Sequence, residues 1–228
     1  MDICIQKEAI EEEIKEACIR SHRSPEDVTL IAVTKYVSPA TTAAALDAGI
    51  QHIGESKVQD AIPKWDELGS RGTWHFIGHL QTNKVKYILG KFSYIHSLDR
   101  LSLAEEIEKR SDGLQLPPLS AFIQVNISGE ESKYGLNPEE LFPFLEELNQ
   151  FSSLQPVGIM TMAPFVEDPE KARPVFAKAR EMLERAKEHY PQFPLKYLSM
   201  GMSNDFVVAV EEGATHVRIG SRLVGREF

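Results

Sequence analysis

Several features that commonly identify the class of a protein are scarce in this sequence. It has only two cysteines, Cys4 and Cys18, and both fall in or just before the first expected helix. They are too few for a metal site, and we expect them to be free thiols of a reducing compartment. No apolar run approaches the length of a membrane span, and the acidic N-terminus lacks the layout of a signal peptide. We therefore expect a cytoplasmic protein that contacts no membrane.

Positive charge is also in short supply. The chain has 25 Lys+Arg against 34 Asp+Glu, which gives a formal net charge of −9 at pH 7. Bulk electrostatics of this sign disfavour binding to a phosphate backbone, so we expect no nucleic-acid partner. The 42% of hydrophobic residues is ordinary for a globular protein. Low-complexity segments and linkers are missing, and we expect residues 1–228 to form one domain.

Short apolar runs alternate with helical stretches after a first expected helix over Gln6–His22. The eight runs expected to be strands are Val28–Thr34, Gln51–Ile53, Thr73–Ile77, Tyr94–His96, Ser120–Asn126, Pro156–Met160, Leu195–Ser199 and Thr215–Ile219. Asn83 is expected to cap the helix after the third strand. Eight strand–helix units in this length favour an α/β fold, a single (β/α)8 TIM-type barrel with an extra N-terminal helix. An open doubly wound sheet shares the alternation and is the alternative.

In a barrel of this kind, the chemistry lies in the loops that follow the strands. The polar or ionisable residues at these positions are Lys35, Glu55, Ser56, His79, Ser97, Asp99, Asn126, Ser128, Thr161, Ser203, Arg218 and Ser221. Loops are polar in any protein, and that accounts for most of this set. It accounts poorly for Lys35 and Arg218, which are contiguous with apolar strand residues. A lysine directed into the barrel would be desolvated, which favours Schiff-base chemistry.

The last two expected strands end in similar turns. Leu198–Ser203 runs from an apolar strand through Gly201 to a serine, and Thr215–Ser221 does the same through Gly220. Backbone N–H groups and a hydroxyl in such turns favour an anion, and a phosphate site after strands 7 and 8 is typical of these barrels. A lysine and a phosphate cradle in one barrel mouth are what pyridoxal phosphate (PLP) requires.

Two other residue types need interpretation. Arg218 either pairs with an acidic neighbour in the core or faces the pyridine nitrogen of the cofactor, where a fixed cation would oppose ring protonation. His75 and His79 are four residues apart, but His75 lies mid-strand and no third ligand is evident, so we expect no metal site. We expect His75 in the core and His79 at the barrel mouth.

Six segments together resemble the pyridoxal-phosphate homeostasis proteins, which have an alanine-racemase-like barrel. The segments are Ala32–Lys35, Gly54–Gln59, His75–Lys84, Gln124–Ile127, Leu198–Asp205 and Val217–Ser221. They occur in the expected order over the whole chain. The resemblance implies that Lys35 carries PLP as a Schiff base, that Ser203, Gly220 and Ser221 hold the phosphate, and that Arg218 faces the ring nitrogen. One position departs from the pattern, since the family usually has asparagine where this chain has Ser56.

The full set of cofactor-binding residues expected on this basis is Lys35, Ser56, His79, Met202, Ser203, Arg218, Gly220 and Ser221. The resemblance implies a carrier that affects PLP supply and amino-acid and keto-acid balance, without catalytic turnover of its own. Its implied partners are PLP and apo forms of PLP-dependent enzymes, and we expect a monomer. A regulatory protein that uses the cofactor as a signal is compatible with this interpretation.

An amino-acid racemase is the competing function. Racemases with this barrel need a second acid–base residue opposite the lysine, typically a tyrosine from a β-domain of a partner subunit. The last expected strand ends near Ile219 and leaves no room for that domain. All six tyrosines fall within the expected barrel units, so none is an evident substitute.

Overall fold

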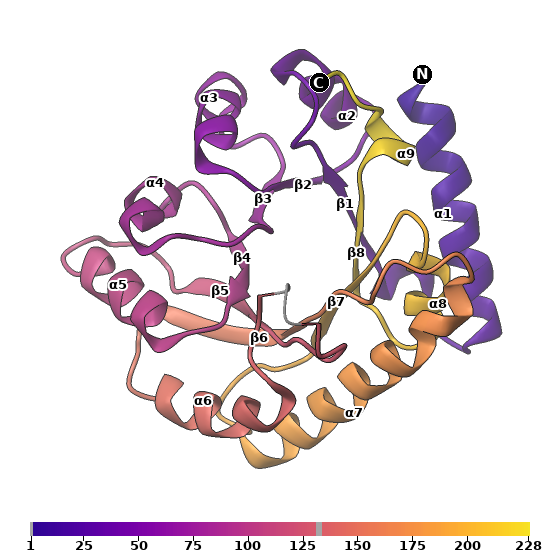
Figure 1. Cartoon of the computed structure of the whole chain (residues 1–228). Helices are drawn as coiled ribbons and strands as arrows, with labels where there is room; N and C mark the ends of the chain where they lie inside the picture. The colour runs from indigo at the N-terminus through magenta and orange to yellow at the C-terminus, as the bar shows by residue number, and fades with distance from the viewer. Residues whose placement is uncertain (1, 131–133) are drawn as a thin grey trace.

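The computed structural model describes residues 2–130 and 134–228 and arranges eight parallel strands in a closed barrel (Figure 1). The strands are β1 (Thr29–Val33), β2 (His52–Glu55), β3 (Thr73–Phe76), β4 (Tyr94–Leu98), β5 (Leu119–Gln124), β6 (Leu154–Met160), β7 (Tyr197–Met202) and β8 (His216–Ile219). They follow one another around the ring in chain order, and β8 closes it by pairing with β1, with Thr29 opposite His216. The (β/α)8 barrel predicted from the alternation is confirmed, and the open sheet is excluded.

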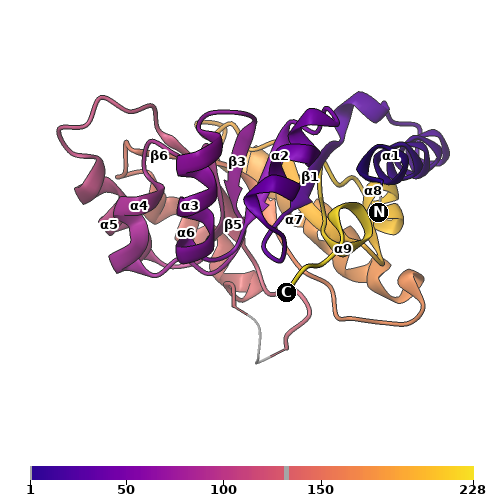
Figure 2. The same cartoon turned by 90° about the horizontal axis from the view of Figure 1, so that it is seen from above.

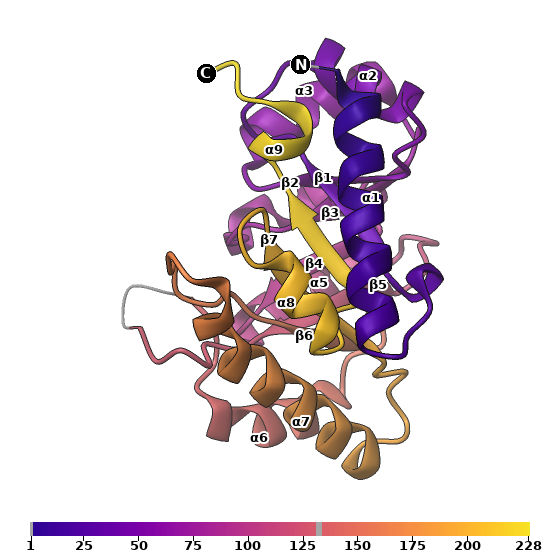
Figure 3. The same ribbon diagram turned by 90° about the vertical axis from the view of Figure 1, so that its right-hand side faces the viewer.

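Helices surround the ring. They are α1 (Ile3–Arg20), α2 (Pro39–Asp47), α3 (Val58–Leu68), α4 (Val85–Ile88), α5 (Leu101–Ser111), α6 (Leu141–Leu148), α7 (Arg173–His189), α8 (Phe206–Glu211) and α9 (Ser221–Val224), with 3-10 turns at Pro25–Asp27, Thr82–Lys84, Pro138–Glu140 and Pro169–Ala172. The extra N-terminal helix is present as α1, which packs along α8 and α9 (Figure 3). None of the helices described is long and apolar enough to cross a membrane.

Two local expectations were wrong. Asn83 does not cap a helix, since it lies inside the 3-10 turn Thr82–Lys84. The seventh strand is shifted toward the C-terminus, because the chain stays extended through Gly201 to Met202. Gly201 has a φ of +92°, and a Cβ there would lie 2.7 Å from the Cβ of Ala209. Only glycine allows the strand to pass this close to α8.

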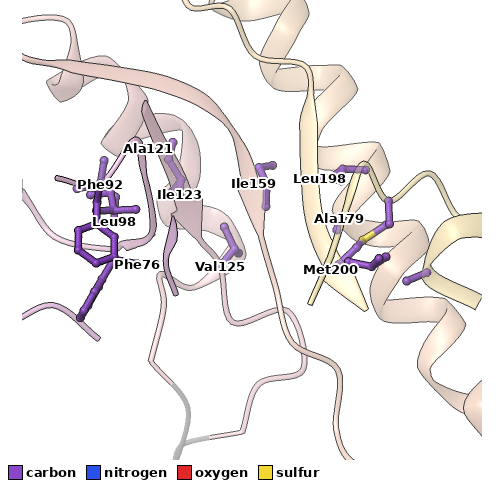
Figure 4. Close-up of a cluster of buried hydrophobic side chains, with 14 of the residues drawn as sticks. Phe76, Phe92, Leu98, Ala121, Ile123, Val125, Ile159, Ala179, Leu198 and Met200 are labelled. Atoms are coloured by element: carbon purple, nitrogen blue, oxygen red, sulfur yellow. The ribbon is translucent and has the colours of Figure 1, made fainter. Parts of the chain in front are cut away.

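The main hydrophobic core lies between the barrel and its helices. Side chains on the outer faces of the strands, such as Ile123, Ile159 and Leu198, meet helical residues such as Ala179 (Figure 4). Cys18 is buried in this layer on α1, whereas Cys4 is exposed, and both are free thiols. The apolar periodicity of the sequence reports this layer, because each strand and helix contributes one apolar face to it.

The interior of the barrel is aromatic and rich in histidine. His75, His96 and His216 are almost fully buried there, with His75 in ring contact with the other two histidines. His96 and His216 also contact the ring of Phe122. Tyr94 stacks on His75, with centroids 4.5 Å apart and an interplanar angle of 4°. The core position predicted for His75 is confirmed. Burial lowers the pKa of all three histidines, and that of His216 falls to about 3.

The buried histidines predict loss of stability in mild acid. A histidine with an ordinary pKa near 6.5 in the unfolded chain and a depressed one in the folded barrel binds its proton only on unfolding. Its contribution is present above about pH 6.5 and is lost as the pH falls toward 3. For His216 we expect a loss of about 2 kcal/mol by pH 5, with His75 and His96 adding in the same direction.

Urea unfolding at a series of pH values measures this loss. The free energy of unfolding should begin to fall below pH 6.5, before the carboxylates with depressed pKa values, such as Glu211, can contribute. The variant His216→Phe should flatten the slope between pH 6.5 and 5. A free energy of unfolding that stays constant down to pH 4.5 would contradict the prediction.

Candidate functional site

A cavity of about 410 Å³ opens at the carboxyl ends of the strands. The last turn α9 and the C-terminus lie toward the same end of the barrel (Figure 2). All eight residues predicted from the sequence line this cavity: Lys35, Ser56, His79, Met202, Ser203, Arg218, Gly220 and Ser221. They come from the loops after β1, β2 and β3 and from the ends of β7 and β8. The cavity therefore unites predicted residues that are up to 186 positions apart in the chain, from Lys35 to Ser221.

Lys35 lies in the tight turn after β1. The turn is closed by a hydrogen bond from the N–H of Val37 to the carbonyl of Thr34, 3.1 Å long. That carbonyl also accepts a 2.5 Å hydrogen bond from Nζ of Lys64, which forms a buried ion pair with Glu55. Lys35 itself is half-buried, with Nζ 4.9 Å from the ring centroid of Tyr36. A buried network thus fixes the backbone beside Lys35 and leaves its amine at the cavity.

Ser56 and His79 follow neighbouring strands, and a glycine brings them together. A Cβ on Gly78 would lie 2.2 Å from the carbonyl oxygen of Ser56, so this approach requires glycine. The ring of His79 stacks on Tyr134 with centroids 4.2 Å apart. Burial lowers the pKa of His79, and the charge of Arg100 lowers it further. Nδ1 of His79 is buried and has no hydrogen-bond partner among the residues described.

The two glycine–serine turns lie next to each other, because β7 and β8 are paired with Met202 opposite Arg218. The N–H of Met202 donates to a carboxylate oxygen of Asp205 over 2.6 Å, which fixes the turn that carries Ser203. Ser203 is half-buried, and Ser221 is exposed at the start of α9. The hydroxyl groups of both serines and the backbone of Gly220 border the same cavity.

Arg218 is the only buried arginine in the part of the chain that the structure describes. Nη1 donates to Oγ of Ser199 over 2.5 Å, and Nη2 donates to the carbonyl of Thr161 over 3.2 Å. Burial lowers the pKa of Arg218 to about 10, and the nearby charge of Asp205 opposes this shift. The side chain therefore remains a cation at neutral pH, held by its own hydrogen bonds at the base of the cavity.

Some of the polar residues at strand ends do not reach the cavity. Glu55 is fully buried in its ion pair, and Ser97 is buried without lining the site. Thr161 donates instead to the carbonyl of Val125 over 2.9 Å, and Asn126 donates to that of Glu130 over 2.9 Å. These residues support loops, which is the ordinary role of polar side chains at such positions.

Several residues that line the cavity were not predicted from the sequence, above all Tyr36, Tyr134 and Arg226. Two of the six tyrosines, Tyr36 and Tyr134, therefore share the cavity with Lys35. Arg226 reaches the site because the C-terminal segment folds back on the turn after β1. The N–H of Glu227 donates to the carbonyl of Tyr36 over 2.9 Å, and the guanidinium of Arg226 lies 4.7 Å from the ring centroid of Tyr36. Such a long-range contact has no local sequence signal.

No group of three or more potential metal ligands occurs among residues 2–130 and 134–228. His75 and His79 do not form a pair, because His75 lies inside the barrel within hydrogen-bond distance of His52 and His96. His79 lies at the mouth, as predicted.

Residues 5–227 match the family described as alanine racemase, N-terminal domain. The chain is 42% identical to the pyridoxal phosphate homeostasis protein of Aquifex aeolicus over 99% of this chain and 98% of that protein. It is 40% identical to the protein of the same name from Pseudomonas aeruginosa over 93% of this chain and 90% of that one.

Solved structures show the same relationship. PipY of Synechococcus elongatus PCC7942, solved with PLP bound, is 36% identical with a TM-score of 0.81, over 95% of this chain and all (100%) of that one. An alanine racemase of Clostridium difficile is only 13% identical, with a TM-score of 0.73, and this chain covers 56% of it, so it shares the barrel fold alone. The chain belongs to the family of pyridoxal phosphate homeostasis proteins, whose barrel is the alanine racemase N-terminal domain.

Proposed function

We propose that this protein binds pyridoxal 5′-phosphate in the cavity at the carboxyl end of its barrel and acts as a carrier of the cofactor. The observation that carries the proposal is the gathering of one lysine, three serines and one buried arginine around a single cavity of about 410 Å³. The names of the relatives and the PLP bound to PipY support it. The bound cofactor would supply an aldehyde that condenses with an amine and a ring that withdraws electrons.

The residues present fit this group. Lys35 offers its amine to the cavity, and the turns of Ser203 and Ser221 offer hydroxyl and backbone donors. Arg226 and Arg218 both line the cavity, and two positive charges suit a phosphate ester. The cavity is therefore matched to an anionic, aromatic aldehyde.

The expected phosphate contacts can be tested by comparing pyridoxal 5′-phosphate with pyridoxal. Ser203→Ala should cost about 1.5–3 kcal/mol of binding free energy for the phosphate ester, because a charge-assisted bond to a dianion is lost. Ser221→Ala should cost less, since Ser221 is exposed. Ser24→Ala, at the remote 3-10 turn Pro25–Asp27, is the control and should bind like the parent protein. Equal affinity of the parent for the two ligands would rule out the phosphate site.

Two features favour carriage of the cofactor over catalysis. The Arg218 cation at the ring side opposes protonation of the ring, which weakens the cofactor as an electron sink. The mouth is open to water, with 59% of Tyr134 and 38% of Met202 exposed. An open site favours exchange of the cofactor, whereas enzymes of this chemistry exclude water. We infer a cytoplasmic monomer that hands PLP to apo-enzymes, and the two free thiols suit that compartment.

The carrier proposal is tested with the cofactor-loaded protein and a panel of L- and D-amino acids. We expect no racemisation or keto-acid formation near the roughly 1–10³ per second of ordinary enzymes, and we expect transfer of PLP to an apo-enzyme. Because Tyr134 lines the cavity with Lys35, Tyr134→Phe is the informative variant. Turnover by the parent that is lost in Tyr134→Phe would establish the racemase alternative.

A further inference from the structure

A line of hydrogen-bonding side chains runs through the barrel interior and ends on Arg218. Nη1 of Arg218 lies 2.5 Å from Oγ of Ser199, which lies 2.8 Å from Nδ1 of His96. Nε2 of His96 lies 2.9 Å from Nδ1 of His75, and Nε2 of His75 lies 2.9 Å from Nδ1 of His52. These five residues, one each from β8, β7, β4, β3 and β2, are called the histidine chain below.

The three rings of the histidine chain are neutral at pH 7. Burial lowers the pKa of His75 and His96 well below the ordinary value, and nearby charges, including His216, lower it further. Burial also lowers the pKa of His52. A neutral imidazole has one N–H donor and one bare nitrogen that accepts. Each ring can therefore donate on one side and accept on the other, and all rings must be oriented in the same sense.

The hydrogen bonds of Ser199 fix the orientation of the three rings. A guanidinium only donates, so Arg218 uses a lone pair of the hydroxyl oxygen. Within the described part of the chain, the other hydrogen-bond partner of this oxygen is Nδ1 of His96. The hydroxyl hydrogen therefore goes to Nδ1, and His96, His75 and His52 must each carry their hydrogen on Nε2. In the opposite sense, the Ser199 hydrogen would have no acceptor, which is costly in a buried site.

The far end of the histidine chain meets solvent. His52 is the first residue of β2 and lines a separate cavity of about 640 Å³ at the amino-terminal end of the barrel. Its Nε2 hydrogen can bond water there. The chain thus spans the barrel from one mouth to the other, and every link has its acceptor side toward Arg218. Aligned dipoles of this kind stabilise the cation and strengthen one another.

We propose that Ser199, His96, His75 and His52 are positioning residues that hold the Arg218 guanidinium oriented and charged at the cofactor site. The proposal rests on the proposed function in that it assigns Arg218 to the ring side of PLP. It adds that a residue two or three links away, with no contact to the cavity, acts on the cofactor through Arg218. His216 gives the matched control, since it is buried among the same rings but bonds Thr215 instead, with Nδ1 2.9 Å from Oγ1.

The first test uses the ligand-free protein. Two-bond ¹H–¹⁵N spectra of ¹⁵N-histidine-labelled protein distinguish the two neutral tautomers, and we expect His52, His75 and His96 as Nε2–H at pH 7. The side-chain ¹⁵N resonances of Arg218 should shift in Ser199→Ala and in His75→Phe and shift much less in His216→Phe. Nδ1–H tautomers in the chain, or Arg218 resonances that respond equally to His75→Phe and His216→Phe, would overturn the proposal.

The second test uses 4′-deoxypyridoxine 5′-phosphate, which has no aldehyde and so reports the ring and phosphate contacts without the bond to Lys35. Ser199→Ala and His75→Phe should each weaken its binding about tenfold, because an Arg218 donor is left unpaired or free to turn. Ser199→Thr keeps the hydroxyl and should restore binding, and His216→Phe should bind like the parent. Equal binding by His75→Phe and His216→Phe would overturn the positioning role.

The two tests separate this inference from the proposed function. If the parent protein binds neither pyridoxal 5′-phosphate nor its analogue, the carrier function fails, and the tautomers and Arg218 resonances still decide the histidine chain. If the parent binds both ligands and the Arg218 resonances do not change in Ser199→Ala, the positioning role of the histidine chain is wrong and the carrier function is retained. Thermal unfolding of each variant identifies any that do not fold, and Ser199→Ala is the smallest change.

Discussion

Replacing Lys35 with alanine should abolish covalent capture of pyridoxal 5′-phosphate while the barrel stays folded. A Schiff base needs an unprotonated amine within reach of the aldehyde, and Lys35 is the only lysine that lines the cavity among the residues described. Among the residues described, its side chain makes no ion pair, and Nζ lies over the Tyr36 ring. We therefore expect complete loss of the covalent bond and little loss of stability.

The measurement combines absorption with chemical trapping. The parent protein should become yellow with pyridoxal 5′-phosphate, lose that band on borohydride reduction, and yield a labelled peptide that contains Lys35. Lys57→Ala is the matched control, because Lys57 lines the smaller neighbouring cavity beside Ser56 and His79. A Lys35→Ala variant that still forms the band, or a label on another lysine in the parent, would move the site elsewhere.

The barrel and its mouth could be predicted because the signals for them are local. Each strand is an apolar run, and parallel strands place all their carboxyl ends on one face, so residues such as Lys35 and Ser203 were assigned to one site without knowledge of any contact. The turn glycines mark where the backbone must pass close to a neighbour, as Gly201 does beside Ala209. For these residues, position in the chain determines position in space.

The features that could not be predicted depend on contacts between segments that are distant in the sequence. Arg226 reaches the cavity through the bond between Glu227 and Tyr36, residues 191 positions apart by their numbers. The histidine chain needs one polar residue on the inner face of each of several strands, and each of these looks like an isolated core histidine in its own strand. Glu55 follows an expected strand and was therefore predicted at the mouth. No local sequence signal indicates that it forms a buried ion pair with Lys64, nine residues further on.

The Glu55–Lys64 pair predicts the largest loss of stability from a single substitution. Glu55 is fully buried and Lys64 is 4% exposed, with Nζ and Oε1 only 2.7 Å apart. The hydroxyl of Thr34 donates to the same carboxylate oxygen over 2.6 Å. Burial raises the pKa of Glu55, and the charge and hydrogen bond of Lys64 oppose that shift. Lys64 is therefore what allows a carboxylate to stay charged in this part of the core.

We expect Lys64→Met to lower the free energy of unfolding by about 3–5 kcal/mol, because it leaves a buried charge uncompensated. The double variant Glu55→Gln/Lys64→Met should recover part of this loss, because the glutamine is neutral and keeps an acceptor for Thr34. Arg71→Met is the control, since the Arg71–Asp47 pair is largely exposed and should contribute about 1 kcal/mol or less. Urea unfolding with a common m-value measures all four proteins.

Lys64→Met should also affect the cofactor site, because it removes one hydrogen bond. Nζ of Lys64 donates to the carbonyl of Thr34, the residue just before Lys35, so Lys64→Met removes the donor that fixes this turn. Covalent capture of pyridoxal 5′-phosphate should then slow in Lys64→Met even at temperatures where the variant is folded. Glu55→Gln alone keeps that donor and should capture the cofactor faster than Lys64→Met. A Lys64→Met variant as stable as Arg71→Met would show that the buried pair contributes no more to stability than a surface pair. Capture by Lys64→Met as fast as by Glu55→Gln would show that Lys64 does not position Lys35.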